Sequence, residues 1–151
     1  MPPGGSSPPG GSAHPGATRY SVQGQAAPAC FDELHALLER VSENHPDVGR
    51  EDLDMLETAV IEIAGNVVEH GRPPGEVAYS FFLEVTPTAL ESVLIESGTE
   101  VPPDLDEPRA APDDMSETGR GLLLAGAVLD ELRYERRDGQ NTWTMVRGRR
   151  S

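Results

Sequence analysis

The most informative stretch of this sequence is AVIEIAGNVVEHG, residues 59–71. At about 100° per residue it predicts an amphipathic helix, because the apolar side chains fall on one stripe. That stripe consists of Leu56, Val60, Ile63 and Val67. Along its edge, at four-residue steps, run Glu62, Asn66 and His70. A carboxylate and a carboxamide beside a core edge are costly unless a ligand or a network satisfies them, so the helix is also a candidate site.

The same polar spacing also arises by chance on solvated helix faces, and for this helix alone that interpretation stays open. A second segment, SETGRGLLLAGAVLDEL at residues 116–132, favours a site. In it, Gly119 and Gly121 flank Arg120 directly before a strongly apolar helix pattern. Such glycines either mark an ordinary loop-to-helix junction or let backbone amides approach an anion at a helix N-terminus.

The overall composition limits the possible partners and compartments. The net charge of −14 argues against nucleic acid as the main partner, because phosphate binding needs clustered cations. An acidic balance suits solubility or docking to a basic protein surface. The compact basic group Arg147, Arg149 and Arg150 ends the chain, where we expect a solvated tail.

The single Cys30 excludes an internal disulfide and is expected to be a buried small hydrophobe. With neither a membrane span nor a signal-like N-terminus, these features predict a soluble cytoplasmic protein without membrane contact.

Composition also divides the chain. Residues 1–18 are almost wholly Gly, Pro, Ser and Ala and predict a disordered tail, followed by one domain at 19–148 and a basic tail at 149–151. Hydrophobic periodicity predicts secondary structure within the domain. We expect helices at 31–43, 50–70 and 121–132 and strands at 19–25, 77–85, 90–95, 132–136 and 142–147. This order predicts an α+β fold, a two-layer sandwich with the helices on one face of a mixed or antiparallel sheet.

Some residues between these elements predict local features. Gly71 is a natural C-terminal cap for the long helix, and Asp138-Gly139 predicts a tight hairpin turn between the last two strands. Residues 96–116 form a Pro- and Asp-rich loop without apolar period, and a loop of this length inside a domain is often a functional lid. Tyr79 and Trp143 are expected to pack in the sheet rather than stack on bases.

Three motifs occur in one order at domain-scale spacing: Glu62 with Asn66, then Glu96-Ser97-Gly98, then residues 119–122. This combination resembles the GHKL ATPase superfamily, which has the Bergerat fold. It is most similar to the anti-sigma-factor serine/threonine kinases of RsbW and SpoIIAB type. The resemblance covers roughly residues 19–148, and it implies ATP and Mg²⁺ as cofactors.

The resemblance also implies roles for individual residues. Glu62 matches the catalytic base that accepts the proton of the attacking hydroxyl or water. Asn66 matches the residue whose side-chain oxygen binds Mg²⁺. Arg120 would stabilise charge on the transferring γ-phosphoryl group. His70 matches a less uniform position, either a phosphate contact or a helix-end residue. The remaining nucleotide-binding positions implied by the resemblance are Glu96, Gly98, Gly119, Gly121, Leu122 and Thr142.

The middle motif departs from the family pattern. The family has aspartate, any residue, then glycine, and the aspartate accepts a hydrogen bond from the adenine amino group. Here Glu96 keeps the acceptor but is one methylene longer, and Thr99 and Glu100 add bulk and negative charge. A Pro-bearing loop at 102–104 still resembles the anti-sigma branch.

Two kinds of function follow from the resemblance. The first is an anti-sigma factor that binds a sigma factor and phosphorylates a STAS-type antagonist protein, with homodimerisation implied by the family. The second is a non-catalytic regulatory binding module whose nucleotide binding is weak or lost. An α+β interaction domain with no nucleotide site is a third possibility.

Overall fold

The computed structural model describes residues 17–70, 76–98 and 117–150, and only the backbone of residues 117–121. The expected tail up to residue 16, the expected cap Gly71 and residues 99–116 of the expected lid lie outside the described residues. The elements in chain order are β1 (Thr18–Gln25), α1 (Ala29–Asn44), α2 (Arg50–His70), β2 (Ala78–Val85), β3 (Ala89–Glu96), α3 (Glu117–Val128), β4 (Glu131–Arg137) and β5 (Gln140–Gly148).

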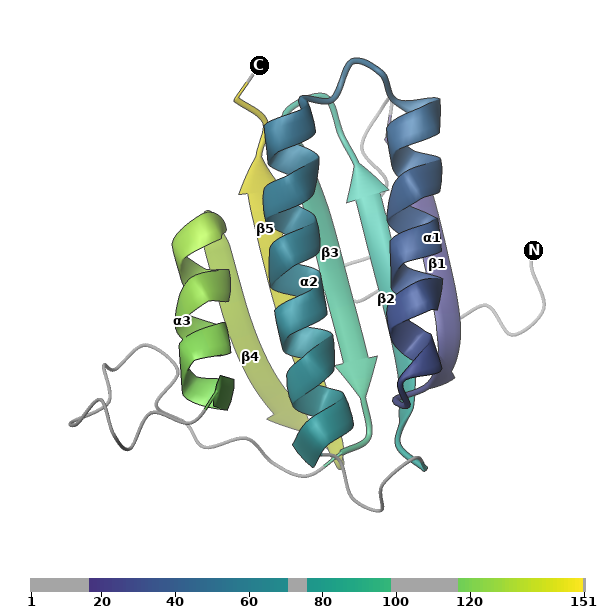
Figure 1. Cartoon of the computed structure of the whole chain (residues 1–151), viewed down its shortest axis with the longest axis vertical. Coiled ribbons are helices and arrows are strands. Elements are labelled where there is room, and N and C mark those ends of the chain that lie inside the picture. The colour runs from purple at the N-terminus through teal and green to yellow at the C-terminus, as the bar shows by residue number, and fades with distance from the viewer. Residues whose placement is uncertain (1–16, 71–75, 99–116, 151) are drawn as a thin grey trace.

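The five strands form one sheet in the order β1-β2-β3-β5-β4, and every neighbouring pair is antiparallel. Helices α1, α2 and α3 cover one face of this sheet (Figure 1). Helix α2 lies in the middle, between α1 on the β1 side and α3 on the β4 side. The predicted α+β two-layer sandwich is therefore confirmed, with the antiparallel form of the sheet. Within the described residues, no helix has the length and apolar character that crossing a bilayer requires.

The core lies between the sheet and the helices. Strands β2, β3 and β5 alternate buried and half-buried residues, as period-2 side-chain direction requires when only one face is covered. Trp143 is 0% exposed and Tyr79 4%, which confirms the prediction that both pack in the sheet. Cys30 is buried at 2% exposure, and desolvation raises the pKa of its thiol to about 11. It is the small buried hydrophobe that the sequence predicted.

The predicted end of the third helix is wrong. The pattern predicted a helix at 121–132, whereas α3 spans Glu117–Val128. After α3 the Asp130 N–H donates to the Val146 carbonyl at 2.8 Å, and Leu132 then pairs with Met145 in the sheet. The apolar residues of this segment suit a helix and an inward-facing strand equally, so periodicity could not separate them.

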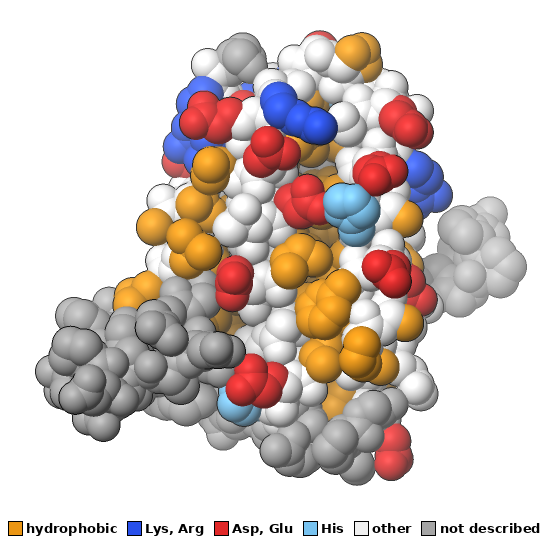
Figure 2. Space-filling view, in the orientation of Figure 1, with side chains coloured by type: hydrophobic (Ala, Val, Ile, Leu, Met, Phe, Trp, Pro, Cys, Tyr) orange, Lys and Arg blue, Asp and Glu red, His pale blue; other side chains and the backbone are white. Residues whose placement is uncertain are grey.

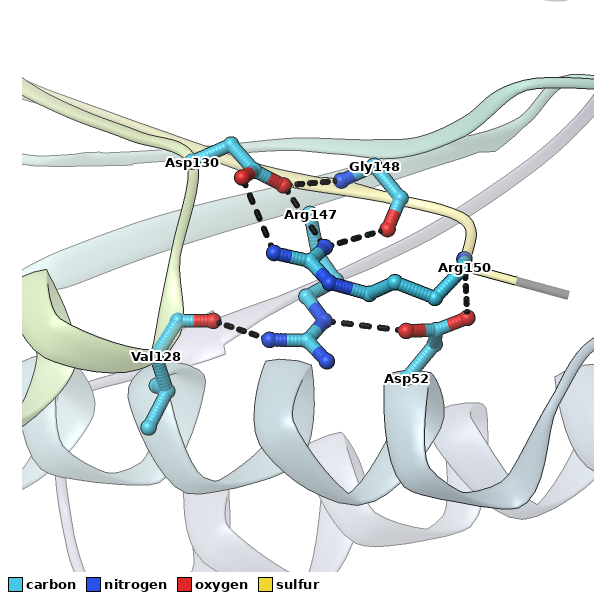
Figure 3. Close-up of polar contacts among 6 residues, drawn as sticks. All are labelled: Asp52, Val128, Asp130, Arg147, Gly148 and Arg150. Atoms are coloured by element: carbon cyan, nitrogen blue, oxygen red, sulfur yellow. Dashed lines mark hydrogen bonds and ion pairs between the residues drawn. The ribbon is translucent and has the colours of Figure 1, made fainter.

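The expected solvated C-terminal tail is also wrong, because β5 carries Arg147 into the interior (Figure 3). The Arg147 side chain is 8% exposed, and its Nε donates to Asp52 Oδ1 in the first turn of α2 at 3.0 Å. Its Nη1 donates to the Val128 carbonyl, at the end of α3, at 2.9 Å. One guanidinium therefore joins β5, α2 and α3 at the same end of the molecule.

The last two arginines are also held by the domain. Arg149 donates to the Thr86 carbonyl at 2.9 Å and to Asp47 Oδ2 at 2.8 Å. Arg150 pairs with Asp130, and its guanidinium together with the Gly148 N–H lowers the pKa of that carboxyl to about 2. The hydrogen bonds and ion pairs of these basic residues hold the C-terminal segment against the domain, although the Arg150 side chain remains 48% exposed.

Candidate functional site

The predicted site residues gather at the end of the sandwich opposite Arg147. Helix α2 ends there at His70, β3 ends at Glu96, and α3 and β5 both begin there (Figure 1). The register pairs Glu96 with Asn141, the second residue of β5. Four segments that are distant in sequence thus meet around one end of the helix layer.

On α2, Glu62 and Asn66 lie on the edge that faces α3. Glu57 lies on the opposite edge of α2 and contacts His35 of α1. The Glu57 edge therefore faces α1, and the edge with Glu62 and Asn66 faces α3. Glu62 is half-buried, and His70 is exposed beside Glu69 at the end of the helix. The structure therefore brings Glu62 and Asn66 together at the α2–α3 junction, while His70 lies at its rim.

Asn66 carries an unsatisfied acceptor. The residue is only 7% exposed, and its Oδ1 finds no hydrogen-bond donor within the described parts of the chain. A buried polar atom without a partner costs about 1–3 kcal/mol. Native structures rarely keep such an atom unless a ligand or ordered water completes it. A side-chain amide oxygen is also a ligand type that Mg²⁺ accepts.

The glycines of the GRG segment lie inside the first turns of α3. The helix begins at Glu117, so Gly119, Arg120 and Gly121 are helical rather than in a preceding loop. The first turn of a helix has N–H groups without intrahelical partners, and these favour an anion. Leu122 is buried, and α3 packs along α2. The side chain of Arg120 lies outside the described residues.

Glu96 is held by donors from the chain itself. It is 3% exposed; its Oε1 accepts the Gly98 N–H at 2.6 Å, and its Oε2 accepts Asn141 Nδ2 at 2.9 Å and Trp143 Nε1 at 3.1 Å. A carboxylate offers about four acceptor positions, so these three donors occupy most of its capacity. The sequence did not reveal Asn141 and Trp143 as partners, because their contact with Glu96 depends on the β3–β5 register.

The same network fixes the turn that follows β3. Asn141 Oδ1 accepts hydrogen bonds from the Tyr134 hydroxyl and from Arg136 Nη1, the latter at 2.8 Å. Arg136 Nη1 also donates to the Gly98 carbonyl at 3.0 Å. Both the N–H and the carbonyl of Gly98 are therefore engaged by side chains.

Thr142 is not brought to this group of residues. Along β5 the buried residues Asn141 and Trp143 face the helices, so the half-buried Thr142 between them faces the uncovered side of the sheet. It pairs with Ile95 on that side. Asn141 takes the inward position at the candidate site.

The candidate site contains few acidic metal ligands. In the described ranges no cluster of three or more His, Cys, Asp or Glu could hold a metal ion. Asn66 is the residue whose chemistry fits Mg²⁺, provided that a ligand's phosphates and water supply the other oxygens.

The family of the chain follows from sequence comparison. Residues 25–147 match the histidine kinase-like ATPase domain, so the chain belongs to that family. This confirms the expected GHKL superfamily and its fold. No curated protein sequence matches the chain closely.

Solved structures with a similar fold include the following two. The RsbU and RsbW domains of Rv1364c from Mycobacterium tuberculosis are 17% identical with a TM-score of 0.60, over 89% of this chain and 33% of that chain. The catalytic domain of histidine kinase ThkA (TM1359) in a nucleotide-free form is 12% identical with a TM-score of 0.52, over 86% of this chain and 97% of that one. The chain therefore spans a third of the first structure, and at these identities the likeness describes the fold.

Proposed function

We propose that this protein is an ATP-dependent serine/threonine protein kinase that acts as a cytoplasmic anti-sigma factor. It would bind a sigma factor and phosphorylate a STAS-type antagonist, and it would work as a homodimer. Membership of the histidine kinase-like ATPase family and the fold shared with an RsbW-containing structure support this proposal.

The observation that carries the proposal is the buried, unpartnered Oδ1 of Asn66 on the same helix edge as Glu62. Asn66 would hold Mg²⁺, and the first turn of α3 with Gly119 and Gly121 would hold the phosphates. Bound Mg-ATP supplies the transferable γ-phosphoryl group. The Glu62 carboxylate would accept the proton of the attacking hydroxyl. Arg120 would neutralise charge on the phosphoryl oxygens.

Calorimetry with and without Mg²⁺ tests nucleotide binding. We expect Mg-ATP to bind and to raise the melting temperature, since a ligand that binds only the folded state stabilises it. Asn66→Ala should remove the Mg²⁺ dependence, and Glu62→Ala should abolish phosphoryl transfer while ATP still binds. Absence of binding at millimolar Mg-ATP would contradict the kinase proposal.

A second candidate function is a regulatory binding module with weak or lost nucleotide binding. The engagement of Glu96 by Gly98, Asn141 and Trp143 favours it, because little acceptor capacity is left for an adenine amino group. Equal binding of Mg-ATP and Mg-GTP would indicate that the site is kept but the adenine contact is lost. Absence of binding of both nucleotides would indicate that the whole site is lost.

A further inference from the structure

Helices α1 and α2 lie side by side on the outer surface, and the line along which they meet, on the side of α2 away from Asn66, is called the α1–α2 groove. The contact between His35 and Glu57 fixes the register of the two antiparallel helices. One turn below this contact, Phe31 of α1 lies opposite Ile61 of α2, and Val68 continues the same edge of α2. All three are partly buried hydrophobic residues packed on the core. Figure 2 shows hydrophobic side chains gathered along the middle of this face, with acidic side chains around them.

Gly65 lies beside this groove in the middle of α2. A Cβ built on Gly65 would meet no atom within 4 Å, whereas one on Gly24 would lie 3.0 Å from the Glu33 carboxylate. Packing against the described residues therefore does not require glycine at position 65. Glycine inside a helix costs about 1 kcal/mol relative to alanine. The space where a side chain would stand at position 65, one turn from both Ile61 and Val68, is therefore open.

The charged side chains of the two helices and their connection are mostly acidic. Eleven Asp or Glu and two Arg lie between residues 29 and 70. Asp32 and Glu39 on α1 and Asp54 and Glu69 on α2 are exposed carboxylates on the outward side of the two helices. A second copy of this chain would present the same negative charge and be repelled, so the charge favours a cationic occupant.

We propose that the α1–α2 groove docks an amphipathic helix of a partner protein, with apolar residues on one face and Lys or Arg along its flanks. The apolar residues would occupy the open space at Gly65 and contact Phe31, Ile61 and Val68, in the helix-in-groove manner. The cationic flanks would face the exposed carboxylates. This inference goes beyond the proposed kinase function, because docking in this groove needs neither nucleotide nor phosphoryl transfer.

Fluorescence anisotropy with a defined peptide tests the proposal on the full chain without nucleotide. The probe is a labelled 18-residue peptide with leucines at helical spacing and lysines elsewhere, compared with a scrambled peptide of the same composition. We expect the patterned peptide to bind at least about tenfold tighter, with affinity that falls as salt rises. Equal binding of the two peptides would overturn the proposal, because it would show charge attraction without a groove.

Gly65→Leu is the decisive variant, with Ala127→Leu as its matched control. Leucine is a good helix former and has open space at position 65, so the melting temperature should hold or rise. Binding of the patterned peptide should fall about tenfold. Ala127 is an exposed position on α3, where the same added bulk should leave binding unchanged.

A second variant covers the case in which Gly65→Leu unfolds. Asp54→Asn with Glu69→Gln keeps the shape of the surface and should weaken peptide binding with a shallower salt dependence. Unchanged binding in this variant, or an equal loss in Gly65→Leu and Ala127→Leu, would overturn the proposal. Since no nucleotide is present, these outcomes are independent of whether the protein binds ATP.

Discussion

Replacing Arg147 by methionine removes a buried cation that joins β5 to both α2 and α3. Methionine keeps an unbranched, flexible apolar stem that reaches about as far as the arginine Nε, but it has none of the guanidinium donors. Asp52, which is 2% exposed, would lose its contact with Arg147 Nε and keep only the Arg150 N–H at 2.9 Å. The Val128 carbonyl at the end of α3 would lose its donor as well.

The size of the effect follows from the burial of this pair. Breaking a buried ion pair by removing one partner costs about 3–5 kcal/mol, since the remaining charge is left uncompensated. Arg147 and Asp52 are both more than nine-tenths buried, so this range applies. For a domain of this length, that loss corresponds to a fall in melting temperature of about 10 °C.

Urea and thermal unfolding followed by circular dichroism measure the effect, with four proteins compared. We expect Arg147→Met and Asp52→Leu to be strongly destabilised, and the double variant to recover much of the loss because both buried charges are gone. Arg50→Met is the control: its contact with Asp54 is 3.9 Å long and exposed, so the change should be within about 0.5 kcal/mol.

Two results would refute this reasoning. One is a loss below about 1 kcal/mol for Arg147→Met, the range expected of an exposed pair. The other is additivity of the two single variants, because residues in one ion pair must show coupling.

Three further predictions concern single residues. Glu96→Asp should lower the free energy of unfolding by about 2 kcal/mol in urea titrations, because the shorter side chain cannot reach all of its internal donors. The hydrogen bond to Glu57 raises the pKa of His35 in the folded state, so its contribution to stability is complete below the ordinary histidine pKa and is lost as pH rises through the folded value. As pH rises above the ordinary histidine pKa, stability should therefore fall more steeply in the wild type than in His35→Gln. Cys30 should react with a thiol reagent only after unfolding, since burial raises its pKa and blocks access.

Each of these three has an outcome that contradicts it. Tighter ATP binding by Glu96→Asp at unchanged stability would restore the adenine-contact interpretation. Parallel pH profiles for wild type and His35→Gln would remove the interhelical role of that imidazole. Rapid labelling of Cys30 in the native protein would mean that α1 opens readily from the sheet.

The sequence alone determined the features that depend on local periodicity and turn chemistry. It predicted α2 with both observed ends, because acidic residues begin the helix and an apolar stripe runs through it. The predicted hairpin turn at Asp138-Gly139 is confirmed, because these two residues have positive φ angles of 54° and 78°, which Asp and Gly tolerate. The order of helices and strands also predicted the two-layer arrangement, in which the helices cover one face of the sheet.

The contacts of the polar side chains depend on how the strands and helices pack in three dimensions. Glu96 meets Asn141 and Trp143 because of the β3–β5 register, and a one-residue shift of β5 would turn Asn141 and Trp143 to the other face, away from Glu96. Arg147 is buried rather than solvated because β5 continues far enough to carry it between α2 and α3. Local sequence fixes which residues share a face, but partners more than forty residues apart are chosen by strand pairing and helix packing, which no local pattern encodes.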